Sequence, residues 1–95
     1  MDLYTDEEIG KIIKRMRVYK NLTQGELGEK LGVQAAAVQK WESGKVTNIK
    51  RSMLQKLAVE LNISPAVLIG FKSVDLAYLK HLDEVDNFVK KLESE

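Results

Sequence analysis

Apolar residues recur at helical spacing along most of the chain, and no segment shows the strict alternation typical of a strand. The first pattern predicts a helix over residues 6–20, marked by Ile9, Ile13 and Met16 on one face. Further patterns predict two short helices, over residues 24–31 and from Gln34 to the glycine at position 44, and a longer helix over residues 49–61. We therefore expect an all-α fold.

Start and stop signals support these boundaries. Thr23 with Glu26 three residues later has the spacing of a capping box, and the same spacing begins at Thr5. Ser64 followed by Pro65 is typical of an N-cap and first helical position, and predicts a fifth short helix through residues 67–69.

Composition limits the classes of protein that the chain can represent. Its 95 residues, 44% hydrophobic and 31% charged, suit one small globular domain. There is no cysteine, and the single histidine, His81, has no ligand cluster around it, so we expect neither a metal site nor a cofactor. The acidic N-terminus lacks the features of a secretion signal, and the longest apolar run is too short to span a bilayer, so we expect a cytoplasmic protein.

The formal net charge of +1 hides a strong asymmetry along the chain. Residues 9–58 contain eleven basic and three acidic side chains, a net charge of +8, whereas the remainder has a net charge of −7. A basic body between acidic ends is the distribution expected when one face meets phosphate, although a solvated surface would carry the same charges. The motifs must decide between these interpretations.

Two short helices joined by a turn at Gly32 suggest a helix-turn-helix, with Gly28 at the point of closest approach. The segments "LTQGELGEKLGV", "VQKWESGK" and "LQKLAVELNIS" resemble the Cro and phage-repressor type of helix-turn-helix regulators. The resemblance covers residues 9–71 and is most specific at the Trp-Glu-x-Gly block. It implies a five-helix lambda-repressor-like DNA-binding domain in residues 1–71. Beyond it the chain departs from the family motif, and the apolar spacing in residues 72–95 predicts an additional C-terminal amphipathic helix for dimerisation or packing.

The resemblance also implies residue roles. The positions that would face base edges are Gln34, Ala35, Ala36, Gln39 and Lys40. Those that would contact DNA phosphates are Gln24, Ser43, Lys45, Thr47, Asn48 and Lys50. Arg17 and Glu42 resemble a structural ion pair between the first helix and the end of the third. Trp41 could stack on a base, but its place on the apolar face favours a core position.

The three consecutive alanines give a specific hypothesis about base readout. An alanine methyl can contact a thymine methyl but cannot form the bidentate hydrogen bonds of arginine or glutamine. We therefore expect Ala35 and Ala36 to select thymine, Lys40 to read guanine, and Gln34 to read adenine or contact a phosphate. Alternatively, an alanine-rich turn is simply good helix-forming sequence, and the surface then serves a protein partner.

The segment after Gly70 carries a heptad seam of apolar residues at positions Tyr78, Leu82, Val85, Val89 and Leu92. It either packs on the fifth helix or pairs with a second subunit, and we favour a dimer contact shared with Leu68, Ile69 and Phe71. Such a homodimer would place two recognition helices about 34 Å apart, one turn of DNA.

The sequence contains no motif that predicts an enzymatic site. "SGKVT" resembles the end of a phosphate-binding loop, but Gln39 stands where its first glycine should be and Val46 where its magnesium-binding hydroxyl should be. The glycine-rich "GELGEKLG" lacks the dinucleotide-binding spacing, and no strand precedes it. The sequence therefore predicts a non-enzymatic, double-stranded DNA-binding repressor of the phage or mobile-element kind. The alternative is a helix-turn-helix module whose main partner is a regulatory protein, like an antitoxin bound by its toxin.

Overall fold

A computed structural model of the chain describes residues 3–72, 84 and 87–93. Five helices form its body: α1 (Asp6–Tyr19), α2 (Gln24–Leu31), α3 (Ala35–Glu42), α4 (Arg51–Leu61) and α5 (Pro65–Leu68). Residues 87–93 are also helical. Across the described ranges the only β-type pairing is one isolated bridge, so the predicted all-α class is confirmed.

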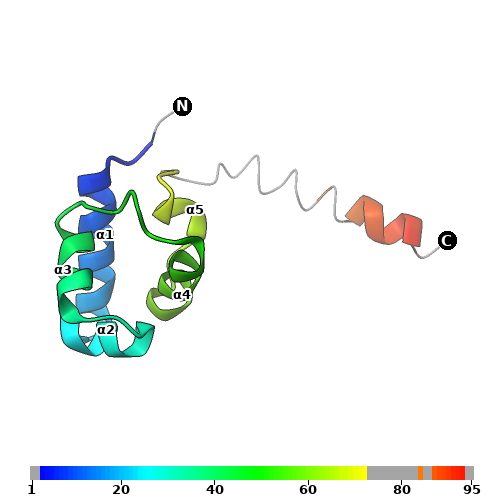
Figure 1. The fold of residues 1–95 in the computed structure, drawn as a ribbon. Coiled ribbons are helices and arrows are strands. Elements are labelled where there is room, and N and C mark those ends of the chain that lie inside the picture. The colour runs from blue at the N-terminus through cyan, green and yellow to red at the C-terminus, as the bar shows by residue number, and fades with distance from the viewer. Residues whose placement is uncertain (1–2, 73–83, 85–86, 94–95) are drawn as a thin grey trace.

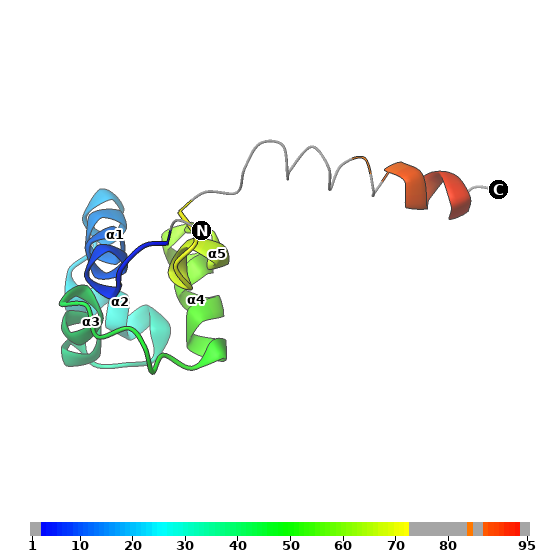
Figure 2. The same ribbon diagram turned by 90° about the horizontal axis from the view of Figure 1, so that it is seen from above.

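The helices pack into a small bundle, with α3 on one side of α1 and α4 on the other in Figure 1. Helix α1 contacts both α3 and α4, while α2 contacts the same two helices at one end of the body. Figure 2 shows α1 and α3 on one side and α4 with α5 on the other. The helix-turn-helix pair, α2 and α3, is therefore supported from behind by α1 and α4. None of the helices in the described part of the chain is long and apolar enough to cross a membrane.

Local capping explains most of the observed boundaries. Both predicted capping boxes are present, with the Thr5 and Thr23 hydroxyls each accepting a hydrogen bond from the backbone amide three residues later. Gly32 ends α2 in the left-handed conformation, with a φ of 79° that a glycine adopts without steric cost. Two expected starts shift: Gln34 is the extended N-cap of α3, and α4 begins at Arg51.

The core is one apolar cluster lined by every helix of the body. Trp41 is 7% exposed within it, which confirms its expected core position. The buried apolar residues are Ile9, Ile13, Leu27, Leu31, Val38, Trp41, Val46, Leu57, Ala58, Leu61, Ile63 and Leu68. Each helix therefore contributes an inward apolar stripe to this cluster.

Two glycines allow helices to approach more closely than any other residue would. A Cβ added at Gly28 would lie 2.6 Å from the Val33 carbonyl oxygen, so the turn into α3 lies directly on α2. A Cβ at Gly10 would lie 2.7 Å from the Trp41 oxygen, 2.8 Å from the Glu42 oxygen and 2.9 Å from the Gly44 nitrogen. The last turn of α3 is thus seated on the backbone of α1.

The two ends of the helical body meet. The backbone N–H of Tyr4 donates to the Gly70 oxygen at 2.7 Å, and Leu3 forms the isolated bridge with Phe71. The Lys72 ammonium lies 5.8 Å from the centroid of the Tyr4 ring. The segment that precedes α1 is therefore tied to the segment that follows α5.

The expected dimer contact needs one correction. Leu68 is only 4% exposed and belongs to the core, because α5 turns this residue toward α4, so it is not part of the free surface. Ile69 and Phe71 remain exposed, at 61% and 38%. Val89 and Leu92 lie on the helical stretch 87–93 and are exposed as well. Tyr78, Leu82 and Val85 lie outside the described residues.

Candidate nucleic-acid interface

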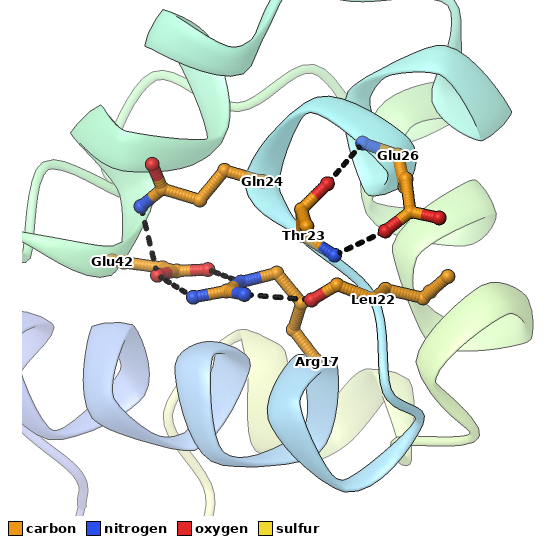
Figure 3. Close-up of polar contacts among 6 residues, drawn as sticks. All are labelled: Arg17, Leu22, Thr23, Gln24, Glu26 and Glu42. Atoms are coloured by element: carbon orange, nitrogen blue, oxygen red, sulfur yellow. Dashed lines mark hydrogen bonds and ion pairs between the residues drawn. The ribbon is translucent and has the colours of Figure 1, made fainter.

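A charged cluster holds the end of α3 against α1. The Arg17 Nε donates to the Glu42 Oε2 at 2.6 Å and its Nη2 donates to Oε1 at 3.0 Å, which is a bidentate ion pair (Figure 3). The two side chains are 11% and 4% exposed. The hydrogen bond to Glu42 raises the pKa of Arg17 further above its ordinary value. The structure therefore contains the ion pair that the resemblance implied.

The same cluster reaches α2 and the turn before it. The Arg17 Nη1 donates to the Leu22 carbonyl oxygen at 2.7 Å, and the Gln24 Nε2 donates to the Glu42 Oε1 at 3.1 Å (Figure 3). No buried side-chain polar atom in the described ranges lacks a hydrogen-bond partner. Because a satisfied polar network at low solvent exposure rigidifies its surroundings, the direction of α3 is fixed from both α1 and α2.

The start of α2 is fixed independently of that cluster. The Glu26 carboxylate accepts from the Thr23 backbone N–H at 2.9 Å, and the Thr23 hydroxyl accepts from the Glu26 N–H at 3.0 Å. The hydrogen bond from the Thr23 backbone lowers the pKa of Glu26. Gln24 is the first residue of α2, and its side-chain amide donates to Glu42 at the end of α3.

The outward face of α3 presents the residues expected to read bases. Val38 and Trp41 point into the core, and Ala37 packs against it. The five remaining positions at the start and along the outer face of the helix are exposed: Gln34, Ala35, Ala36, Gln39 and Lys40. The Gln34 side chain makes no capping hydrogen bond to α3. The sequence thus divides α3 into a buried face and a uniformly exposed one.

The surface that follows α3 is basic. Residues 33–59 contain five basic side chains and one acid, Glu42, whose charge is neutralised by Arg17. Neither α3 nor α4 has an acidic residue in its first turn, whereas α1 and α2 do. Because the N-terminus of a helix is the positive end of its dipole, the starts of α3 and α4 keep a positive potential that no acidic side chain of their first turns offsets.

The loop between α3 and α4 forms a pocket of about 330 Å³ beside the last turn of α3. Three expected phosphate contacts, Lys45, Thr47 and Asn48, line it together with Lys40. Ser43 lies at the C-cap of α3, where its hydroxyl donates to the Lys40 carbonyl oxygen at 2.7 Å. Lys50 is exposed at the N-cap of α4.

The pocket also contains a residue that sequence reasoning did not single out. Asp6, the first residue of α1, lines the pocket, and its Oδ2 accepts a hydrogen bond from the Thr47 hydroxyl at 3.0 Å. In the sequence Asp6 belongs to an acidic first turn that is fully explained by helix capping. Gly10 was missed as well, although a glycine inside a helical pattern signals a packing requirement.

Comparison with known proteins assigns this arrangement of helices to a family. Residues 13–68 match the helix-turn-helix family HTH_3. An uncharacterized HTH-type transcriptional regulator of Sinorhizobium fredii is 34% identical over 61 residues, which are 64% of this chain and 42% of that protein. The chain therefore spans less than half the length of this relative.

Solved structures share the fold. The P22 c2 repressor, in complex with a synthetic operator, is 30% identical with a TM-score of 0.58, over 63% of this chain and 89% of the other. The biofilm regulator SinR, in complex with DNA, is 33% identical with a TM-score of 0.57, over 64% and 97%. The restriction-modification controller protein C.AhdI of Aeromonas hydrophila is 28% identical with a TM-score of 0.57, over 66% and 90%.

Proposed function

From the premise that the chain belongs to the helix-turn-helix family of the phage-repressor type, we propose that it is a sequence-specific, double-stranded DNA-binding transcriptional repressor. One observation carries the proposal. The outward positions of α3 are exposed, all five basic residues between residues 33 and 59 are exposed as well, and the only acid in that range is neutralised by Arg17. A helix with such surroundings suits the major groove and the phosphates beside it.

The readout would follow from the residues on that face. The methyl groups of Ala35 and Ala36 would contact thymine methyls, and Lys40 would donate to guanine. Gln34, at the start of α3, would reach an adenine or a phosphate. The remaining contacts, from Gln24 and from the loop that contains Lys45, would position the protein on the backbone without carrying sequence information.

Lys40→Ala tests the base assignment. If Lys40 reads guanine, the variant loses about 1–3 kcal/mol of binding free energy at one base pair of the operator and becomes indifferent to that base. Competition binding against duplexes changed one base pair at a time measures this directly. An equal loss on every duplex would instead assign Lys40 to the backbone.

Two copies of the chain would bind together. Ile69 and Phe71 are exposed beside the end of α5, and Phe88, Val89 and Leu92 are exposed on the helical stretch 87–93. Covering these apolar side chains between two subunits would hold two α3 helices for successive major grooves, about 34 Å apart. The expected operator is then an inverted repeat.

Selection of randomised duplex DNA by the purified chain, at near-physiological salt, tests the proposal as a whole. Enrichment of an inverted repeat is expected, with an affinity that falls with salt by a logarithmic slope of about −0.9 per neutralised phosphate. If no sequence is enriched and binding shows no such salt dependence, the exposed face of α3 serves a protein partner and the proposal is wrong.

A further inference from the structure

The pocket beside α3 combines cationic and anionic walls. The Lys40 and Lys45 side chains and the polar groups of Thr47 and Asn48 come from the end of α3 and the following loop. Asp6 comes from the other side, at the first residue of α1. A carboxylate is unexpected here, because every other side chain that lines the pocket is cationic or uncharged.

We propose that Asp6 is a residue that limits the affinity of this protein for the DNA backbone, by competing with a phosphate for the pocket lined by Lys45 and Thr47. The proposal rests on the DNA-binding function proposed above and adds a specific determinant to it. It concerns affinity that is independent of base sequence, since phosphate contacts carry no sequence information.

The competition follows from hydrogen-bond chemistry. A threonine hydroxyl has one proton to donate, and the Thr47 hydroxyl gives it to the Asp6 Oδ2 at 3.0 Å. A phosphate oxygen that accepts a hydrogen bond from the Thr47 hydroxyl needs the same proton. Both acceptors carry a negative charge, so the phosphate must displace Asp6 from Thr47 and then remain close to its carboxylate.

The neighbouring acids of the first turn of α1 are engaged differently. The Glu8 carboxylate accepts from the Thr5 backbone N–H at 3.0 Å within the capping box and does not line the pocket. Glu7 packs its backbone and Cγ against Gly44, where an added Cβ would come within 3.2 Å of the Glu7 Cα. Asp6 is therefore the acid of this turn whose carboxylate contacts the loop between α3 and α4.

The magnitude follows from the charge. Two like charges about 6 Å apart at a solvated surface repel by enough to change affinity roughly threefold, and a lower local dielectric raises this toward about tenfold. Removing the Asp6 charge should therefore strengthen binding by about three- to tenfold on every duplex. The logarithmic salt slope should steepen by up to about 0.9, because one more phosphate is effectively neutralised.

The test compares Asp6→Asn with Asp6→Glu and Glu60→Gln by fluorescence anisotropy, using a duplex of arbitrary sequence at several salt concentrations. Asparagine keeps an oxygen that can accept from Thr47 and removes the charge, with an NH2 group in place of the second carboxylate oxygen. Glutamate keeps the charge. Glu60 lies in the last turn of α4, about 14 Å along the helix from its start at Arg51, so Glu60→Gln controls for the change in net charge.

The proposal expects Asp6→Asn alone to bind about three- to tenfold more tightly, with a steeper salt slope, while the other two variants remain within twofold of the unmodified protein. Equal affinity of Asp6→Asn and the unmodified protein would overturn it, as would weaker binding, which would make Asp6 a positioning residue for Thr47. A gain of the same size in Glu60→Gln would also overturn it. If the unmodified protein shows no salt-dependent binding to duplex DNA, the proposed function itself fails, which is a different and distinguishable result.

Discussion

Gly10→Ala tests the seating of α3 on α1. The added methyl carbon would lie 2.7–2.9 Å from three backbone atoms in the stretch from Trp41 to Gly44. Backbone atoms cannot move aside by changing rotamer, so the last turn of α3 must shift by about half an ångström or more to restore ordinary contact. Overpacking of this kind costs about 1–3 kcal/mol, and three fixed neighbours favour the upper end.

Helix propensity acts in the opposite direction. Alanine in a helix interior is favoured over glycine by about 1 kcal/mol, so the expected net loss of unfolding free energy is about 2 kcal/mol. For a domain of this size, that loss lowers the melting temperature by about 10 °C. Trp41 is the only tryptophan in the sequence and is buried, so its fluorescence reports unfolding at the site of the perturbation.

Gly25→Ala is the matched control. Gly25 also lies in a helix, but the nearest atom to an added Cβ is the Thr23 hydroxyl oxygen at 3.8 Å, which is ordinary contact. This variant should gain about 0.5–1 kcal/mol, because the unfolded chain loses conformational freedom. If Gly10→Ala melts at or above the temperature of the unmodified protein, the close approach of α1 and α3 does not require glycine and the reasoning is refuted.

Two further predictions concern the polar groups. Arg17→Met should lower the unfolding free energy by about 3 kcal/mol in urea titrations, because it leaves Glu42 charged at low exposure. Arg17→Lys should retain only part of the stability, because it keeps the charge but not the bidentate geometry; full retention in Arg17→Lys would contradict a role for that geometry. The pKa values of Glu8 and Glu26 are lowered, mainly by the backbone hydrogen bonds of their capping boxes. Their carboxylates therefore stabilise the fold fully above the ordinary pKa of 4.5. This stability is lost as the pH falls through the lowered pKa values of the folded state. The double variant Glu8→Gln with Glu26→Gln should melt below the unmodified protein at pH 7, and the difference should shrink as the pH falls through the lowered pKa values of the two carboxylates. A difference independent of pH would contradict this assignment.

Much of the fold was predictable because its signals are local. The Thr23 capping box, the left-handed Gly32 and the Ser64–Pro65 start depend on residues a few positions apart, and each appears where the sequence places it. The inward stripe of α3, including Trp41, follows from helical periodicity. The family resemblance supplied the ion pair of Arg17 with Glu42, which no local pattern reveals, since its members are 25 positions apart.

What escaped prediction depends on the tertiary arrangement. Leu68 continues an apolar run that looks suited to a dimer surface, but the packing of α5 on α4 turns this residue into the core. Asp6 contacts Thr47 across 41 positions, and its acidic neighbours suggest only helix capping. The role of Gly10 becomes visible when α3 lies against α1. In each case the partner is set by how helices pack, which residue spacing does not encode.

The pairing of Tyr4 with Gly70 and of Leu3 with Phe71 also has a mechanical consequence. A tension applied between the two ends of the helical body loads this single backbone hydrogen bond and bridge before it loads any helix. The body would therefore peel from its ends inward, through the start of α1 and through α5. The hydrogen bonds that join Arg17, Glu42 and Gln24, at the other end of α1, would resist until later. Under load, the unit formed by α2 and α3 would thus be the part that keeps its shape longest.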